Sequence, residues 1–442
     1  MNPKTFKIKS FGCQMNVYDG ERMGELLSAK GMSAAADPDD ADLVVLNTCH
    51  VREKAAEKAY SDIGRLRRED GSRPLIALAG CVAQAEGAEA KRRSSLIDIV
   101  VGPQAYHRLP EMVAKATRGA RPVDTDMPAI SKFDAFPARR RANPSSFLTV
   151  QEGCDKFCTY CVVPYTRGAE ISRPWGDIVD EAKELADAGA REIVLLGQNV
   201  NAWSDGKRGL AQLIREIAMI GPVERIRYTT SHPADMTDDL IAAHGEVDKL
   251  MPYLHLPVQS GSNRILKAMN RSHTADTYLA ILAKMRAARP DIALSGDFIV
   301  GFPGETEKDF EATLQIVDEV RYASAYTFKY SPRPGTPAAT MEDQIPRDIM
   351  EDRLERLNDR INAHRLAFNR SMVDSDTQIL IERPGKHRGQ MIGRSPWLQS
   401  VHVDTDAKPG DILDVAVVAA SSNSLSGAVR ETGLSFVDGV AA

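Results

Sequence analysis

The feature that most constrains the fold is an alternation of short apolar segments with amphipathic helical segments, which continues through most of the chain. The apolar segments predict buried strands, and the helical periodicity between them predicts connecting helices. Strands linked by helices pair in parallel, because each helix returns the chain to the same end of the sheet. The sequence therefore predicts an α/β protein, and its 442 residues suffice for two or three domains.

The alternation falls into two series. The first predicts an open parallel sheet, with strands at 7–11, 42–47, 75–79 and 97–101 and helices at 18–30 and 52–68. The second predicts a partial (β/α)6 barrel with its active site at the carboxyl ends of the strands. Its predicted strands are 147–151, 192–196, 225–229, 253–257, 292–300 and 325–330, and its helices include 177–188, 210–220, 275–288 and 307–320.

The rest of the chain sets the predicted domain boundaries. A polar passage rich in Pro and Arg predicts a linker at 122–144, so the first domain covers 1–121 and the partial barrel 145–375. A long charged helix at 347–372 leads out of the barrel. Short strands at 378–382, 390–393, 400–403 and 412–419 then predict a small β-barrel over 376–442.

The composition excludes several classes of protein. Hydrophobic residues make up 43% and charged residues 26%, as in a globular protein and not a disordered one. The sequence contains no apolar run long enough to cross a bilayer and no apolar signal segment near Met1, so we expect a cytoplasmic protein without a membrane span. The formal net charge is −5, so any nucleic acid must be bound by local basic patches.

All six cysteines fall before residue 162. In a reducing compartment they stay as thiols, so their clusters indicate metal or redox chemistry and not a disulfide framework. Cys154, Cys158 and Cys161 form a C-x3-C-x2-C motif just after the first strand of the second series. Thiolates this close repel one another unless a metal ion or cluster neutralises them.

Zinc is one alternative for this motif, but structural zinc usually takes four ligands and no fourth cysteine lies nearby. An iron–sulfur cluster held by three thiolates leaves one iron open to a substrate. The other three cysteines, Cys13, Cys49 and Cys81, each follow closely on a predicted strand. Three buried thiols are the simple explanation. The carboxyl ends of parallel strands share one edge of a sheet, however, so these thiols can also converge on one cluster.

The C-x3-C-x2-C motif, with Tyr160 before its third cysteine, resembles that of the radical S-adenosylmethionine (SAM) enzymes. The segment from Gly296 to Glu305 resembles their glycine-containing SAM strand. The residues around the other three cysteines resemble the N-terminal domain of the methylthiotransferases. Further similarity at 197–200, 228–233, 255–262 and 330–337 extends over nearly the whole chain and favours the bacterial tRNA branch over the branch that modifies a ribosomal-protein aspartate. His50 is a departure, since a small polar residue is expected there.

The resemblance implies two [4Fe–4S] clusters and SAM as cofactors. Cys154, Cys158 and Cys161 would hold the cluster whose open iron chelates SAM and cleaves it to a 5′-deoxyadenosyl radical. Cys13, Cys49 and Cys81 would hold an auxiliary cluster that binds or donates sulfur, and a second SAM would supply the methyl group. The residues that would contact SAM are Tyr160, Gly296, Ile299 and Gly301. A reductant such as a flavodoxin-type electron donor and a sulfur source are implied partners, and we expect a monomer.

The activity that the resemblance implies is that of a transferase, which replaces C2–H of a dimethylallyl-modified adenosine, 3′ of the tRNA anticodon, with a methylthio group. This carbon carries no acidic proton, so acid–base catalysis cannot open the bond and a radical cofactor is needed. Threonylcarbamoyl-adenosine and a protein aspartate are alternative substrates. A different class would be an RNA-binding protein with structural or redox-sensing clusters and no SAM cleavage.

The C-terminal segment resembles a TRAM domain, an RNA-binding β-barrel. Over 376–442 it carries six basic and eight acidic residues, so it does not attract RNA by charge alone. The basic residues near Trp397 suit phosphate contacts and stacking on an unpaired base of the anticodon stem-loop. For each basic residue taken alone, a solvated turn between strands is the better explanation. These candidates are Arg383, Lys386, Arg388 and Arg394.

Other polar residues carry weaker expectations. The arginines at 139–141 and 65–68 are further candidates for phosphate contact, or else solvated surface. We expect His232, His255 and His273 to be hydrogen-bonded structural residues. Gln198 and Gln259, at predicted strand ends, can face the cavity.

Overall fold

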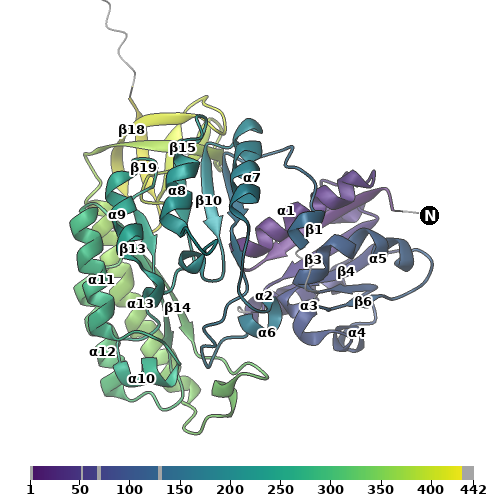
Figure 1. The fold of residues 1–442 in the computed structure, drawn as a ribbon, viewed down its shortest axis with the longest axis horizontal. Helices are drawn as coiled ribbons and strands as arrows, with labels where there is room; N and C mark the ends of the chain where they lie inside the picture. The colour runs from purple at the N-terminus through teal and green to yellow at the C-terminus, as the bar shows by residue number, and fades with distance from the viewer. Residues whose placement is uncertain (1–2, 51–52, 67–70, 128–131, 431–442) are drawn as a thin grey trace, which may run out of the picture.

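The computed structural model describes residues 3–50, 53–66, 71–127 and 132–430. It contains a parallel α/β domain, a partial barrel and a closed C-terminal β-barrel, in the order predicted from the sequence. In Figure 1 the N-terminal domain lies to one side of the partial barrel, and the C-terminal barrel, in yellow, lies at one end of it. Among the described residues, no helix is both long enough and apolar enough to cross a membrane.

The N-terminal domain is a parallel sheet with the strand order β2-β1-β3-β4-β5-β6, which confirms the predicted open sheet. Its central strands are buried on both faces, as expected when helices cover a parallel sheet. The strands are β1 (Thr5–Phe11), β2 (Ser33–Ala34), β3 (Leu43–Thr48), β4 (Leu75–Gly80), β5 (Ile99–Val101) and β6 (Val123–Asp124). The helices are α1 (Gln14–Ala29), α2 (Glu53–Arg65), α3 (Cys81–Glu86), α4 (Glu89–Arg93) and α5 (Leu109–Ala116).

One strand of this sheet lies in the segment that the sequence predicts as a linker. β6 pairs in parallel with β5 and forms the edge of the sheet. It is only two residues long, so it carries no apolar pattern that would distinguish it from a loop.

The partial barrel has six parallel strands in two three-stranded sheets, as predicted. A bridge between Ile226 and Leu250 connects the sheets. The strands are β7 (Ser145–Thr149), β10 (Glu192–Leu196), β11 (Arg225–Tyr228), β12 (Tyr253–His255), β13 (Ala293–Val300) and β14 (Ser324–Lys329). The longer helices are α7 (Trp175–Asp187), α8 (Leu210–Ala218), α9 (Asp238–Glu246), α11 (Ala275–Ala288), α12 (Glu307–Val320) and α13 (Arg347–Arg370).

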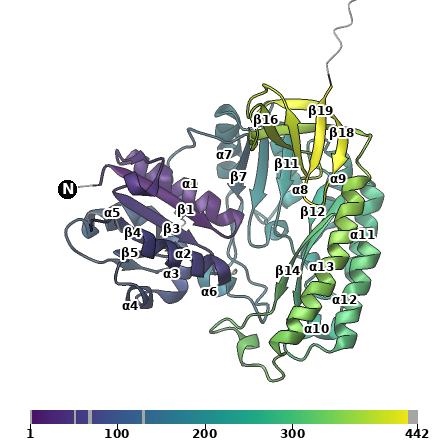
Figure 2. The ribbon, with the colours of Figure 1, turned by 180° about the vertical axis from the view of Figure 1, so that it is seen from behind.

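The helices pack their apolar faces onto the strands and form the largest hydrophobic core of the molecule. Short elements after β7 shape the end of the barrel that holds the cysteine motif. They are β8 (Gln151–Glu152), α6 (Val163–Arg167), β9 (Ile171–Ser172) and α10 (Asn263–Ala268). Figure 2 shows α13 running from the β14 side of the barrel toward the C-terminal barrel.

The C-terminal barrel is closed by five strands, one more than the sequence predicts. The additional strand, β19, pairs in parallel with β17 and antiparallel with β18. Closure removes the free sheet edges and encloses a small apolar core. The strands are β15 (Asp376–Pro384), β16 (Gln390–Arg394), β17 (Ser400–Asp404), β18 (Ile412–Ala420) and β19 (Leu425–Val429).

Two buried arginines of β11 attach the C-terminal barrel to the partial barrel. Arg225 donates hydrogen bonds to the carbonyls of Arg394 at 2.7 Å and Gln378 at 3.1 Å. Arg227 donates to the carbonyls of Ser395 at 2.9 Å and Pro396 at 2.8 Å. Strands β15 and β16 and the loop between β16 and β17 are therefore all held against β11.

Candidate active site

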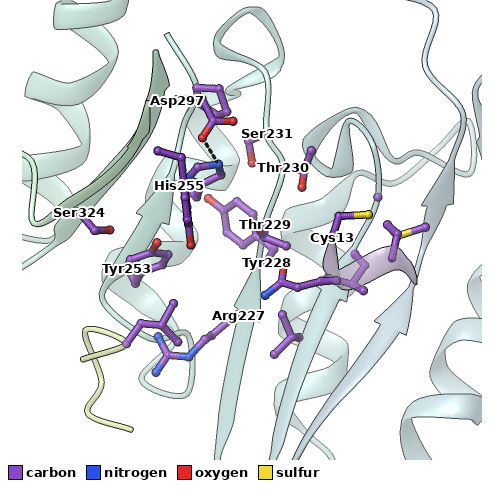
Figure 3. A pocket seen from close by; sticks show the side chains of 18 of the residues that line it. Cys13, Arg227, Tyr228, Thr229, Thr230, Ser231, Tyr253, His255, Asp297 and Ser324 are labelled. Carbon is purple, nitrogen blue, oxygen red and sulfur yellow. Dashed lines mark ion pairs between the residues drawn. The ribbon is translucent and has the colours of Figure 1, made fainter. Parts of the chain in front are cut away.

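All six cysteines line one cavity of about 1020 Å³. The cavity extends from the ends of β1, β3 and β4 through the interior of the partial barrel to the loop between β16 and β17. Ligand cavities are usually about 300–1,000 Å³, so this one can hold more than a single small molecule. Figure 3 shows Cys13 across the cavity from Tyr253 and Ser324, with the residues that follow β11 between them.

The first cysteine triad, Cys13, Cys49 and Cys81, lies at the carboxyl edge of the N-terminal sheet, as the strand pattern predicts. Two glycines allow the close approach. Gly12 has φ +105°, and a Cβ built there would lie 2.2 Å from the Cβ of Cys49. Gly80 has φ +92°, and a Cβ there would lie 2.5 Å from the Thr48 carbonyl oxygen. These backbone conformations favour glycine. Because neither glycine has a Cβ, the segments that carry the three cysteines can pack closely together.

The electrostatics of this triad favour a thiolate. A hydrogen bond with the Cys49 side chain lowers the pKa of Cys13 to about 6, and the positive charge of Arg167 acts in the same direction against the effect of burial. Cys13 Sγ also contacts Asn16 Oδ1 at 3.7 Å. A thiolate is the form that binds iron, so the site suits metal ligation.

The second triad, Cys154, Cys158 and Cys161, lies in the loop between β8 and α6. This loop is held by hydrogen bonds from Thr159, whose N–H donates to the Met269 carbonyl and whose Oγ1 donates to the Ala268 carbonyl. Burial raises the pKa of Cys154 to about 11, and burial with the neighbouring Cys158 raises the pKa of Cys161 to about 12. At neutral pH the thiols of Cys154 and Cys161 therefore stay protonated unless a bound metal centre stabilises their thiolates.

The donor set fits an iron–sulfur cluster better than a zinc ion. Structural zinc usually takes four ligands, whereas each triad offers three cysteine sulfurs. Tetrahedral zinc requires all its ligands around one centre, whereas a cluster binds each thiolate to a different iron. Each triad offers three sulfurs, and all six cysteines are free thiols. Both triads therefore fit a cluster with one iron left open.

The residues expected to contact SAM are not all at the cavity surface. Tyr160 lines it, whereas Gly296, Ile299 and Gly301 are not among its lining residues. A Cβ at Gly296 would lie 3.1 Å from the Tyr322 ring, so the absence of a side chain at Gly296 leaves room for this ring. Ile299 packs in the same apolar cluster as Tyr160. Gly301 has φ +72°, and its N–H donates to Glu305 Oε2 at 2.7 Å.

Polar side chains at the strand ends line the cavity between the two triads. Gln198 and Gln259 do so, as the sequence suggests, and Gln198 Oε1 accepts from the Gly153 N–H at 2.6 Å. Sequence reasoning did not identify Asn199 and Ser231. Both carry a buried oxygen without a hydrogen-bond partner in the structure, which is expected where a ligand supplies the partner.

Backbone strain also marks this region, and no sequence pattern reveals it. Thr230 has φ +67° and Gln259 φ +73°, and both residues line the cavity. Non-glycine residues rarely adopt such angles, and strained residues cluster at functional sites. Thr230 lies two residues after β11 and Gln259 four residues after β12, so both belong to the segments that follow the carboxyl ends of the strands.

Two of the three histidines are hydrogen-bonded, as expected: His232 Nδ1 accepts from the Ala234 N–H at 3.1 Å, and His255 Nδ1 contacts Ser295 Oγ. His232 and His255 line the cavity, whereas His273 is not among its lining residues. Burial lowers the pKa of His232 to about 2, with Arg271 acting in the same direction, so this ring is neutral. His255 contacts Asp297 at 3.5 Å and Ser295 Oγ at 3.1 Å (Figure 3).

The basic candidates for RNA contact divide into two groups. Arg394 lines the cavity with Trp397, whose Nε1 donates to the Asp291 carbonyl at 2.7 Å. The other three are exposed and are not among the cavity-lining residues: Arg383 near the end of β15, and Lys386 and Arg388 on the turn between β15 and β16.

The arginine runs outside this barrel differ in exposure. The expectation for Arg139 is wrong, because its buried side chain pairs with Glu21 at 3.0 Å and cannot meet a phosphate. Arg140 and Arg141 are exposed, as is Arg65. Arg67 and Arg68 lie outside the described residues.

Comparison with known proteins agrees with this architecture. The model of the Radical SAM superfamily matches residues 148–317, and that of the Uncharacterized protein family UPF0004 matches residues 5–102. The partial barrel and its cysteine loop thus define a radical SAM enzyme, a class whose fold implies a [4Fe–4S] cluster and SAM.

A tRNA-2-methylthio-N(6)-dimethylallyladenosine synthase of Novosphingobium aromaticivorans is 67% identical over 96% of this chain and 97% of its own length. Another of Erythrobacter litoralis is 64% identical over 98% of both chains. The chain belongs to the family of the tRNA-2-methylthio-N(6)-dimethylallyladenosine synthases, which confirms the resemblance to the tRNA methylthiotransferases.

Solved structures support the fold alone. The radical SAM methyltransferase TsrM of Kitasatospora setae, with cobalamin and a [4Fe-4S] cluster bound, has a TM-score of 0.56 at 14% identity over 76% of this chain and 77% of its own. The cobalamin-dependent radical SAM enzyme OxsB has a TM-score of 0.52 at 12% identity over 82% of this chain and 56% of its own. Both matches extend beyond the partial barrel.

Proposed function

We propose that this chain replaces C2–H of a dimethylallyl-modified adenosine, 3′ of the tRNA anticodon, with a methylthio group. The observation that carries the proposal is the single cavity lined by both cysteine triads, although the triads come from different domains. A substrate base in this cavity would have a radical source on one side and a sulfur source on the other. An enzyme that only generated radicals would need no second triad.

Each triad has a separate task in this proposal. Cys154, Cys158 and Cys161 hold the [4Fe–4S] cluster that binds SAM, and Cys13, Cys49 and Cys81 hold an auxiliary [4Fe–4S] cluster at which sulfur is supplied. When bound, the first cluster supplies the one-electron reduction of SAM, and thereby a radical able to remove an unactivated hydrogen. The chain keeps the thiols of Cys154, Cys158 and Cys161, which would hold this SAM-binding cluster, buried or half-buried and away from bulk water.

The remaining cavity residues would bind and orient the two ligands. The unpartnered oxygens of Asn199 and Ser231 and the neutral ring of His232 offer hydrogen bonds to SAM. An apolar wall on the far side suits the adenine ring and its dimethylallyl group, because aromatic side chains stack on unpaired bases. This wall contains Tyr253, Tyr326, Phe328, Trp397 and Leu398.

The RNA would approach along the C-terminal barrel. Arg394 and Arg365 line the cavity on that side and can contact phosphates of the anticodon stem-loop, and the exposed Arg383, Lys386 and Arg388 extend the basic surface. The net charge of −5 means that these contacts must be local. In this proposal the protein acts as a cytoplasmic monomer.

Electrons and sulfur must come from outside the chain. Phe157 in the cysteine loop and Tyr165 in α6 are about half exposed, at 53% and 51%, directly beside the second triad. We propose that a reductant such as a flavodoxin-type protein approaches there. The sulfur source would reach the first triad through the same cavity.

The test is mass spectrometry of tRNA nucleosides after anaerobic incubation of the reconstituted protein with SAM, a strong reductant, sulfide and dimethylallyl-modified tRNA. Cys158→Ala and Cys49→Ala serve as matched controls, one for each triad. The proposal predicts a methylthio product that is absent with either variant. If 5′-deoxyadenosine forms without this product, and threonylcarbamoyl-modified tRNA in a parallel incubation gives a methylthio product instead, the proposed substrate is wrong and threonylcarbamoyl-adenosine replaces it. If wild-type protein forms neither, the protein is not this enzyme and a redox-sensing role becomes the better explanation.

A further inference from the structure

One buried side chain links the two cysteine triads directly. Arg167 is the last residue of α6, six positions after Cys161, and its side chain is only 2% exposed. It does not point back to its own triad but crosses the domain boundary into the N-terminal domain. There its Nε–H donates to Sγ of Cys81 at 3.4 Å.

The other nitrogens of this guanidinium are also fully used. Nη2 pairs with Asp19 Oδ2 at 2.7 Å and donates to Asn16 Oδ1 at 3.0 Å. Nη1 pairs with Glu152 Oε1 at 2.7 Å. Asn16 Oδ1 also contacts Cys13 Sγ at 3.7 Å, so Arg167 contacts Cys81 directly and is linked to Cys13 through Asn16.

The carboxylates around Arg167 are neutralised within the same network. Lys132 pairs with Asp19 at 3.2 Å and with Glu152 at 2.8 Å, and both carboxylates are buried. Two cations thus face two carboxylates, and the two cations differ in one respect. Arg167 donates to a cysteine sulfur, whereas Lys132 contacts the carboxylates and the Pro103 carbonyl.

We infer that Arg167 is a positioning residue that sets the reduction potential of the auxiliary cluster and its placement relative to the SAM cluster. This inference rests on the proposed auxiliary cluster at Cys13, Cys49 and Cys81. Hydrogen bonds and positive charge at a cluster sulfur stabilise the reduced, more negative state, so they raise the potential. The rigid guanidinium fork also fixes the Cys81 sulfur relative to α6, and a lysine cannot reproduce that geometry.

The experiment uses the full-length chain with Cys154, Cys158 and Cys161 replaced by alanine, so that iron can bind only at the first triad. Iron content and an EPR-monitored reductive titration are measured with Arg167→Met, Arg167→Lys and Lys132→Met added to this chain. Arg167→Met should shift the potential to more negative values. Arg167→Lys, which keeps the charge and the ion pairs, should give a smaller shift in the same direction. Lys132→Met removes the same charge from the same network and should shift the potential less than Arg167→Met.

The outcomes separate this inference from the proposal beneath it. If the triple-alanine chain binds no iron, the auxiliary cluster is wrong and the inference falls with it. If iron binds but Arg167→Met leaves the potential unchanged, or shifts it no more than Lys132→Met does, only the role of Arg167 is refuted. If Arg167→Met does not fold, the test rests on Arg167→Lys. A small negative shift of its potential supports the role of Arg167, and an unchanged potential refutes it.

Discussion

The substitution Arg227→Met tests how the buried arginines of β11 hold the cavity wall together. Arg227 is 3% exposed and pairs through Nε with Glu192 Oε2 at 2.7 Å, and Glu192 is 1% exposed. Its other nitrogens donate to the carbonyls of Ser395 and Pro396 in the C-terminal barrel. One side chain therefore neutralises a buried carboxylate and attaches a second domain.

The expected loss is large because the carboxylate stays behind. Removing one partner of a buried ion pair typically costs about 3–5 kcal/mol, since the remaining charge is buried without compensation. Burial alone would raise the pKa of Glu192, and Arg227 with Ser145 overcomes this and lowers it. We therefore expect Arg227→Met to lower the free energy of unfolding by about 3–5 kcal/mol, and Glu192→Gln in the same chain to restore most of the loss.

Urea unfolding followed by circular dichroism at pH 7 and pH 4 measures both effects. With its pKa lowered, Glu192 contributes stability above its unfolded value, near 4.5, and loses it as the pH falls through the folded value. Without Arg227, Ser145 and Arg225 oppose burial less effectively, so the pKa of Glu192 rises and more of the carboxyl is protonated in acid. The penalty should therefore be smaller at pH 4 than at pH 7. A loss below about 1 kcal/mol, equal losses at the two pH values, or no rescue by Glu192→Gln would refute the reasoning.

Three further outcomes follow from the site geometry. With Cys49→Ala, 5′-deoxyadenosine should still form from SAM while methylthio product is lost, as liquid chromatography would show; loss of both would mean that the triads are not separable. In iron-free protein at pH 7.5, iodoacetamide should label Cys13 before Cys154, because the pKa of Cys13 is about 6 and that of Cys154 is about 11. Peptide mass spectrometry measures the order of labelling, and the reverse order would contradict this prediction. Gly80→Ala should destabilise the chain by at least about 1 kcal/mol, since a Cβ would meet backbone at positive φ. Gly64→Ala, with open space around it, should not, and equal melting temperatures for the two variants would contradict the steric reasoning.

The sequence predicts the helices of the partial barrel best where their first turns are capped. α11 and α12 begin and end where the periodicity places them, and Thr274 and Thr306 accept hydrogen bonds from the third helical residue of each. The carboxyl-edge positions of Cys13, Cys49 and Cys81 also follow from local patterns, because each lies close after an apolar strand.

What the sequence cannot predict depends on partners far along the chain. Arg139 lies among polar residues and appears solvated in sequence, yet Glu21 and Glu25 of α1 and Glu181 of α7 surround it. β19 carries small residues and pairs with strands on both sides only once the barrel closes. Gly296 resembles a ligand-binding glycine, but the neighbour that requires its small size is Tyr322. In each case the contact joins residues that no local window contains.

The separation of the two triads into different domains also sets an order in time during synthesis. The sheet that carries Cys13, Cys49 and Cys81 is complete once the ribosome has added β6, which ends at Asp124. The walls around Cys154, Cys158 and Cys161 are incomplete until β14, which ends at Lys329. At about 5–20 residues per second, roughly 8–34 s pass between the addition of Cys161 and the end of β14. During that interval the nascent chain carries a finished site for one cluster and three unsheltered thiols for the other, so the second triad is more vulnerable to oxidation while the protein is being made.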